Sequence, residues 1–192
     1  MADDETVETR SQRAIDFYCM GAIEYQTAGL FAGQVHRANK VGAKYLTLWL
    51  TSPGGYIDSM MSMIDSIRAL QADGVVVRCV VRGQAEAEAA WVMLACDERL
   101  MSRYGRVSFG GIDMKDEKGT GFGGRSSKLP DWAAWRLAFV EGITQGLMKR
   151  AGASFTDDQM KLLFGTGEKA PVDFDAEAAL DAGIITGILE VD

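Results

Sequence analysis

The strongest constraint on the fold is an apolar run that ends in a glycine turn and is followed at once by a helical pattern. Residues 45–50 are almost all apolar, as expected for a parallel strand buried on both faces. A turn of sequence TSPGG follows at residues 51–55, and apolar side chains then recur at helical spacing over residues 57–70. The same order returns at residues 75–95. Alternating strands and helices predict an α/β fold with a parallel sheet and right-handed crossovers.

The remainder of the chain continues this alternation and predicts one domain over residues 14–192. Residues 1–13 are polar and predict a flexible tail, whereas the glycine-rich residues 110–128 predict a long exposed loop. We expect further strands at residues 14–23, 75–81, 99–101, 106–109 and 184–191, a turn at Gly83-Gln84, and helices at residues 25–41, 86–95, 131–150, 157–163 and 176–182.

Composition excludes several classes of function. The formal net charge of −7 argues against a general nucleic-acid surface, which needs a basic face. The start of the chain lacks the apolar run of a signal peptide, and no apolar stretch reaches the roughly 18 residues of a membrane helix. We therefore expect a cytoplasmic protein. Cys19, Cys79 and Cys96 lie in apolar contexts without CxxC spacing, which predicts buried reduced thiols and neither a metal site nor a cofactor.

Several segments resemble those of the Clp protease proteolytic subunits. The run LTLWLTSPGGYIDSMMSMIDSIRAL is similar to the strand, Ser-Pro-Gly-Gly turn and helix of that family. GQAEAEAAWVMLACDERLMS resembles its nucleophile helix and following strand, RVSFGG its histidine strand, and FDAEAALDAGIITGILE its C-terminal ending. The resemblance covers residues 15–191 and implies the fold of the Clp-peptidase and crotonase superfamily, in which strand-strand-helix units stack and a long handle helix, here residues 131–150, follows.

The same resemblance identifies the positions of the family's catalytic residues in this chain. Ala87 stands where the family has its nucleophilic serine, and Gly110 stands where it has histidine. An ungapped match places the acidic third member near Pro171, with Asp173 and Asp175 close by. A methyl group and a hydrogen atom thus replace the hydroxyl and the imidazole. An acidic residue near Asp173 has no histidine to orient.

Two further features bear on catalysis. The turn at Gly54-Gly55 follows a buried strand and precedes a helix, a geometry that directs free backbone N–H groups at an anion or a polarised carbonyl oxygen. The chain has a single histidine, His36, which falls in the first predicted helix and is expected to be solvated there. The sequence therefore keeps an oxyanion-like turn but predicts no serine-histidine pair.

Two alternatives remain open at this stage. Glu86 and Glu88 flank the vacated serine position, and the superfamily includes acyl-CoA enzymes that use glutamates as acid and base. Two residues apart on one helix point about 200° apart, so both face one substrate only if the helix begins between them. The second alternative is an active serine peptidase represented by an inactivated variant, which requires the native gene to encode serine at position 87 and histidine at position 110.

The interpretation favoured by Ala87 and Gly110 is a catalytically inactive, Clp-peptidase-like subunit with a structural or regulatory role. The resemblance implies a homo-oligomeric ring of six or seven copies, stacked through the helix at residues 131–150. It also implies partners of two kinds, an active peptidase paralogue or an unfoldase. Nucleic acid and membrane are not expected to be partners.

Overall fold

The central feature of the structure is a parallel sheet whose strands follow one another in sequence order. The computed structural model describes residues 14–110, 114–115, 121–122, 131–164 and 170–190. Its main path runs β1-β2-β3-β4-β9, and every neighbouring pair on this path is parallel. The five strands are β1 (Ala14–Met20), β2 (Tyr45–Ser52), β3 (Val76–Glu86), β4 (Glu98–Ser102) and β9 (Gly187–Leu189).

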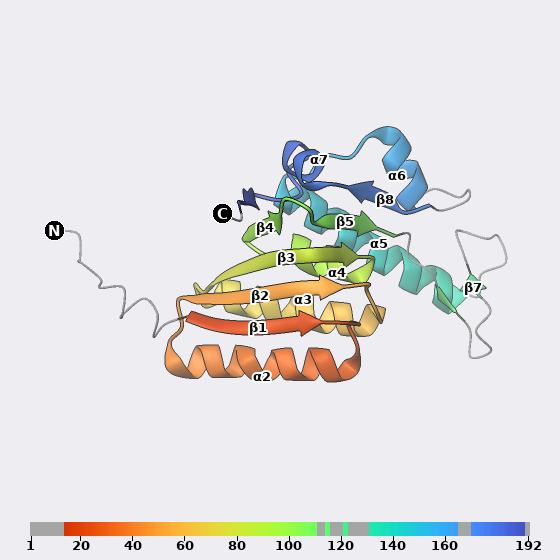
Figure 1. Cartoon of the computed structure of the whole chain (residues 1–192). Helices are drawn as coiled ribbons and strands as arrows, with labels where there is room; N and C mark the ends of the chain where they lie inside the picture. Colours follow the sequence, from red (N-terminus) through yellow and green to blue (C-terminus); the bar gives the residue numbers. More distant parts are fainter. Residues whose placement is uncertain (1–13, 111–113, 116–120, 123–130, 165–169, 191–192) are drawn as a thin grey trace.

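Three helices connect the first four strands. They are α2 (Tyr25–Val41), α3 (Ile57–Ala72) and α4 (Glu88–Leu94). Because the strand order does not reverse and such crossovers are right-handed, all three helices lie on the same face of the sheet. Figure 1 shows α3 and α4 behind β2 and β3. The buried side chains of α3 recur at the predicted helical spacing, with Met60, Met63 and Ile67 at most 1% exposed.

The end of β3 carries a second, smaller branch of the sheet. Residues Gln84, Ala85 and Glu86 pair in parallel with β5 (Arg106–Phe109), which in turn pairs antiparallel with β8 (Val172–Phe174). Glu86 is thereby opposite Ser108, and Ser108 is opposite Asp173. The branch gathers the end of β3, the end of β5 and the start of β8 at one edge of the molecule (Figure 1).

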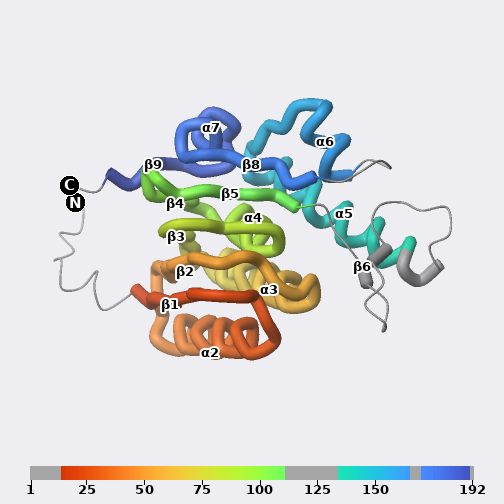
Figure 2. Tube along the Cα trace, turned by 45° about the vertical axis from the view of Figure 1, so that its right-hand side comes forward, coloured from red at the N-terminus to blue at the C-terminus, as the bar shows by residue number. Residues whose placement is uncertain are grey.

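The C-terminal half adds helices around this branch. The longest is α5 (Asp131–Ala151), which confirms the helix predicted at residues 131–150 and reaches past the sheet in the cartoon of Figure 1 and the Cα tube of Figure 2. It is followed by α6 (Asp157–Phe164) and α7 (Ala176–Asp181). Within the predicted loop, β6 (Met114–Lys115) and β7 (Gly121–Phe122) form a short antiparallel ribbon. The predicted tail at residues 1–13 and the rest of that loop after Gly110 lie outside the described residues.

An aromatic cluster joins α4 to the β5–β8 branch. Phe109, at the end of β5, is fully buried, and its ring centroid lies 4.7 Å from that of Trp91 on α4. It also contacts Phe155 at 5.2 Å and Phe174 at 6.1 Å, each edge to face. Edge-to-face contacts of this kind add to the free energy gained from burying the rings. The cluster fixes the end of β5 against the helix layer.

A buried arginine connects β4 to the ends of several helices. Arg99 is only 6% exposed, and its guanidinium donates hydrogen bonds to main-chain carbonyls. The shortest of these hydrogen bonds are those to Ile184 O at 2.8 Å, to Cys96 O at 2.9 Å and to Ala151 O at 3.1 Å. Ile184 follows α7, Cys96 follows α4, and Ala151 is the last residue of α5. Arg99 therefore supplies donors to main-chain carbonyls at the end of α5 and just beyond the ends of α4 and α7.

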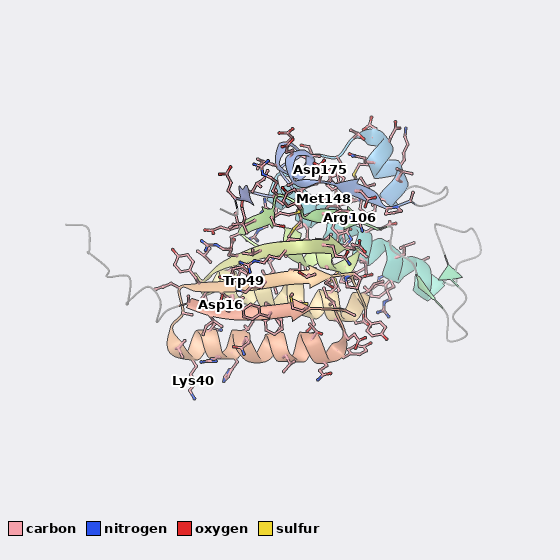
Figure 3. The ribbon with its side chains drawn as sticks, in the orientation of Figure 1. Asp16, Lys40, Trp49, Arg106, Met148 and Asp175 are labelled. Carbon is pink, nitrogen blue, oxygen red and sulfur yellow. The ribbon has the colours of Figure 1, made fainter. Side chains whose placement is uncertain are left out.

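The opposite face of the sheet carries a row of polar and aromatic side chains. The indole of Trp49 on β2 stacks on Tyr18 of β1 at 6.0 Å, and the Arg82 guanidinium lies 4.3 Å from the indole centroid. The indole nitrogen of Trp49 donates to the Asp16 carboxylate at 2.9 Å, and Figure 3 shows these two residues on adjacent strands. The aromatic rings here are organised by cross-strand contacts.

One predicted turn is wrong. Gly83 and Gln84, expected between a strand and a helix, lie inside β3, which continues to Glu86. Gly83 has a φ of 104°, which a glycine adopts without strain, and the register between β2 and β3 shifts between Leu50 and Ser52. The glycine thus marks an irregularity in a long strand. The helix consequently begins at Glu88, two residues later than predicted.

The predicted ends of the sheet also differ from the structure. The first strand stops at Met20 instead of residue 23, and the last comprises only Gly187–Leu189 instead of residues 184–191. The antiparallel strand β8 was not expected. It is three residues long, and it exists because Val172 and Phe174 are buried when they pair with β5. A pairing between segments more than 60 residues apart leaves no local pattern.

All three cysteines are buried and reduced, as predicted. Burial raises the pKa of the Cys19 thiol to about 11 from an ordinary 9.0, and the pKa of Cys79 rises well above that ordinary value for the same reason. Above pH 9 the unfolded chain loses these protons first, so it binds fewer protons than the folded chain and stability falls as pH rises.

We expect the free energy of unfolding to be insensitive to these thiols below pH 9 and to fall between pH 9 and pH 11, by about 2 kcal/mol for Cys19. Urea titrations across this window measure the effect. The Cys19→Ala variant is the control, because lysines and tyrosines also titrate there. A pH slope in that variant as steep as in the parent chain contradicts the prediction.

Candidate functional site

The glycine turn after β2 is held in place by the segment that follows β1. The amide of Ile23 donates to Gly54 O at 2.8 Å, and the amide of Tyr56 donates to Ile23 O at 2.8 Å. A Cβ on Gly55 would lie 2.1 Å from Ile23 O, which no side chain can accommodate. Gly54 has a φ of 100°. Both glycines are therefore required by the backbone, and they present the Gly55 amide toward the start of α4.

Ala87 occupies the junction between β3 and α4 in a strained conformation. Its φ of 47° and ψ of −120° make it the one non-glycine with positive φ among the residues that the structure describes. The Ala87 amide donates to Ser108 O at 2.8 Å, which ties the junction to β5. A sharp strand-to-helix turn of this kind is how several hydrolases expose a nucleophilic side chain. The backbone thus has the form of a nucleophile turn, while the side chain is a methyl group.

Because this φ suits glycine better than alanine, Ala87→Gly is expected to raise the free energy of unfolding by about 1 kcal/mol. The relief of backbone strain exceeds the entropy that a glycine loses on folding. Urea unfolding midpoints give the comparison. Ala85→Gly, at a buried position two residues earlier in β3, is the matched control and should destabilise. A destabilising effect of Ala87→Gly contradicts the prediction.

Gly110 lies directly beside Ala87. A Cβ built on Gly110 would be 3.6 Å from the Ala87 Cβ, an ordinary van der Waals distance. The structure therefore brings together the two positions that the motifs predict for a nucleophile and a base, although they are 23 residues apart in sequence. It also leaves room for a Cβ atom at position 110. At this meeting point the chain offers a methyl group and a hydrogen atom.

Glu88 and Glu86 contact different partners. Glu88 is the first residue of α4, and its carboxylate accepts a hydrogen bond from the Gly55 amide at 2.9 Å. Glu86 ends β3 and pairs with Arg106 of β5, which Figure 3 labels. The helix does begin between the two glutamates. Even so, one carboxylate is directed at the glycine turn and the other at a neighbouring strand.

The acidic residues near the predicted third position have other surroundings. Asp173 lies on β8 with an exposed side chain, between the buried Val172 and Phe174. Asp175 caps α7, because its carboxylate accepts a hydrogen bond from the Ala178 amide at 2.8 Å. Pro171, the residue that matches the family's acidic position, precedes β8 and is exposed. Asp175 thus has a structural role, whereas Asp173 is solvated.

His36 does not belong to this site. It is exposed on α2, as predicted, and lines an open groove of about 700 Å³ between α2 and α3 together with Asn39, Asp58 and Asp65.

In the described part of the chain, no group of three or more histidine, cysteine, aspartate or glutamate residues is arranged to hold a metal ion. None of the helices described there is long and apolar enough to cross a membrane.

The contact between Glu88 and Gly55 was not foreseen. Sequence reasoning treated Glu88 only as a catalytic acid or base and Gly55 only as a hydrogen-bond donor to substrate. The available signal was that a charged residue directly follows the vacated nucleophile position, at the helix start that faces the glycine turn. Bringing the two together required the register of β2 against β3, which no local pattern reveals.

Comparison with known proteins gives one family. A family model described as Clp protease matches residues 5–106, more than half of the chain, and this stretch includes the glycine turn and Ala87. Among curated proteins, the ATP-dependent Clp protease proteolytic subunit of Carsonella ruddii (strain PV) is 35% identical over 82 residues. That match covers 43% of this chain and 40% of the relative's length.

Among solved structures, the chain is similar to that of a ClpP1 mutant from Listeria monocytogenes. The TM-score is 0.70 at 16% sequence identity, and the match covers 96% of this chain and 95% of that chain. This likeness confirms the predicted α/β fold with its parallel sheet. Its coverage of 96% of the chain reaches well beyond residue 106, where the match to the family model ends.

Proposed function

Because this chain belongs to the Clp protease family, we propose that it is a subunit of that family which has lost catalysis and has a structural or regulatory role in a ring-shaped oligomer. The observation that carries the proposal is the meeting of Ala87 and Gly110. The strained backbone at Ala87 keeps the form that presents a nucleophile, and Gly110 lies directly beside it, since a Cβ on Gly110 would be 3.6 Å from the Ala87 Cβ. Neither residue has a reactive group.

The chemistry of serine peptidases depends on both groups. A serine hydroxyl is a weak nucleophile until a neighbouring base accepts its proton, and a third group orients that base. Position 87 lacks the hydroxyl and position 110 lacks the imidazole. The chain's one histidine is on α2, in a different groove. Loss of the hydroxyl and the imidazole together removes nucleophilic catalysis and does not merely slow it.

The acyl-CoA alternative receives less support from the same geometry. An enzyme of that type needs free backbone amides to polarise a carbonyl oxygen and carboxylates directed at the substrate. Here the Gly55 amide is bound to Glu88, and Glu86 is paired with Arg106. The remaining alternative, an inactivated form of an active peptidase, requires changes at both positions 87 and 110.

Self-association has support on α5. Trp135 and Phe139 are 69% and 51% exposed, and their rings stack at 5.6 Å on the outer side of the helix. Exposed aromatic pairs of this kind are favourable centres for protein interfaces. We accordingly propose rings of six or seven copies that stack through α5, in the cytoplasm, with an active peptidase paralogue or an unfoldase as partner. The mass of the native particle, alone and after pull-down from its source, tests this assembly.

The test of inactivity is direct. The purified protein should neither cleave fluorogenic peptides or casein nor react with a fluorophosphonate probe, and coenzyme A thioesters should not raise its melting temperature. Hydrolysis that disappears in Ser108→Ala or Asp173→Asn overturns the proposal, since it would assign the activity to this chain and not to a contaminant. Thermal stabilisation by a thioester would favour the acyl-CoA alternative.

A further inference from the structure

The Gly55 amide is already occupied by an anion that belongs to the chain itself. The Glu88 carboxylate oxygen lies 2.9 Å from the Gly55 nitrogen. Donors that stabilise a developing oxyanion lie about 2.7–3.1 Å from the oxygen that they bind. The carboxylate thus stands where the negatively charged oxygen of a tetrahedral intermediate would receive the same hydrogen bond.

The residues on either side of this contact allow the Glu88 carboxylate to lie close to the Gly55 amide. Glu88 follows the strained Ala87, so the turn that would present a nucleophile also directs the next side chain at the glycine turn. Gly54 leaves the space in which the carboxylate lies, because a Cβ at Gly54 would be 2.7 Å from its Oε2 atom. Charged hydrogen bonds of this type are stronger than neutral ones. A second negative oxygen at the same amide would meet both an engaged donor and a like charge.

We infer that Glu88 acts as an internal inhibitor of the remnant site, by holding the Gly55 amide in place of a substrate carbonyl oxygen. The inference rests on the proposed function and extends it. The site lacks a nucleophile and a base, and its oxyanion donor is blocked as well. Restoring serine and histidine is therefore not enough to restore acylation, because the carboxylate remains at the amide.

The first experiment compares two repaired backgrounds. One carries Ala87→Ser and Gly110→His, and the other carries Glu88→Ala in addition. The rate at which a fluorophosphonate labels the introduced serine, followed by intact mass, should be about 100-fold to 1000-fold higher in the second background, the effect of one oxyanion donor. The matched control carries Glu86→Ala in place of Glu88→Ala. This substitution should leave the labelling rate unchanged, because Glu86 is paired with Arg106 and not with the Gly55 amide.

Equal labelling of the two backgrounds, including none in either, overturns the inference. This outcome is distinct from failure of the proposed function, which is decided by hydrolysis in the unmodified protein. Urea unfolding of each background establishes that the variants are folded before their rates are compared.

A second measurement needs no restored chemistry. Hydrogen exchange of the Gly55 amide, resolved by NMR or by overlapping peptides, should become at least tenfold faster in Glu88→Ala than in the unmodified chain. It should be unchanged in Glu86→Ala. Equal protection in all three proteins would show that the Glu88 contact does not hold this amide in solution.

Discussion

Arg99→Ala is expected to lower the free energy of unfolding by about 4 kcal/mol. The guanidinium is 6% exposed and donates to carbonyls of Ile184, Cys96 and Ala151 at 2.8–3.1 Å. Burial lowers the pKa of Arg99, although an arginine side chain remains protonated in proteins. Without it, several buried carbonyls have no donor, and each costs about 1–3 kcal/mol.

Urea unfolding measures this loss as a shift in midpoint at unchanged slope. Arg78→Ala is the matched control. Arg78 pairs with Glu98 at 2.6 Å on the open face of the sheet, and both side chains are 39% exposed, so its loss should cost about 1 kcal/mol or less. Arg99→Lys keeps the charge but offers a single nitrogen to carbonyls on three sides. We expect this variant to lose more than half of the stabilisation that Arg99 provides. A loss below about 1 kcal/mol for Arg99→Ala contradicts this account.

The second large effect is expected at Phe109. Its ring is fully buried and contacts Trp91, Phe155 and Phe174 at once, so Phe109→Ala leaves a cavity where α4, β5 and β8 meet. Large-to-small changes of this type cost about 3–5 kcal/mol. The reason is twofold, since the ring loses its burial and its neighbours lose their edge-to-face contacts.

The same unfolding measurement applies to Phe109→Ala, with two comparisons. Phe109→Leu, which refills part of the cavity, should cost less than half as much. Tyr104→Ala removes an aromatic ring that is 95% exposed and should change stability by less than about 0.5 kcal/mol. If Phe109→Ala and Tyr104→Ala were equally tolerated, the aromatic cluster would not be part of the stabilising core.

Much of the fold follows from local patterns. The apolar run at residues 45–50, the helical spacing after the TSPGG turn and the helix at residues 25–41 each specify an element that the structure contains. In these segments the hydrophobic period, the glycine turn and the helix formers agree with one another. The alternation of strand and helix is then sufficient to predict a parallel sheet with helices across it.

The differences arise where distant segments decide the local structure. Gly83 and Gln84 were expected to form a turn because glycine commonly ends a strand, yet β3 continues since β5 is available to pair with its last residues. For the same reason β8 exists only because it pairs with β5. These pairings join segments that lie far apart along the chain, which a pattern over a few neighbouring residues does not contain.

In the candidate site, too, local motifs predict some features and contacts between distant segments decide others. Motif matching singled out Ala87 and Gly110, and the structure places the two positions side by side. The strained φ of Ala87 was not predictable, because alanine seldom adopts it and the sheet around the junction imposes it. The contact between Glu88 and Gly55 was not predictable either, because it joins residues that are 33 positions apart in the sequence.

The longest helix of the molecule is fastened to one neighbour at two places. Arg136, near the start of α5, pairs with Asp58 at the start of α3, and Arg150, near the end of α5, donates to Gln71 near the end of α3 at 3.1 Å. The attachment points are about 21 Å apart along α5 and about 20 Å apart along α3 at roughly 1.5 Å per residue.

The two helices therefore run in the same direction with matching spacing. Because both contacts are made by exposed side chains, each contributes little to the free energy of folding. Their consequence is orientation: they keep α5 parallel to α3, while buried side chains such as Leu137, Val140 and Leu147 supply the packing that holds the helix.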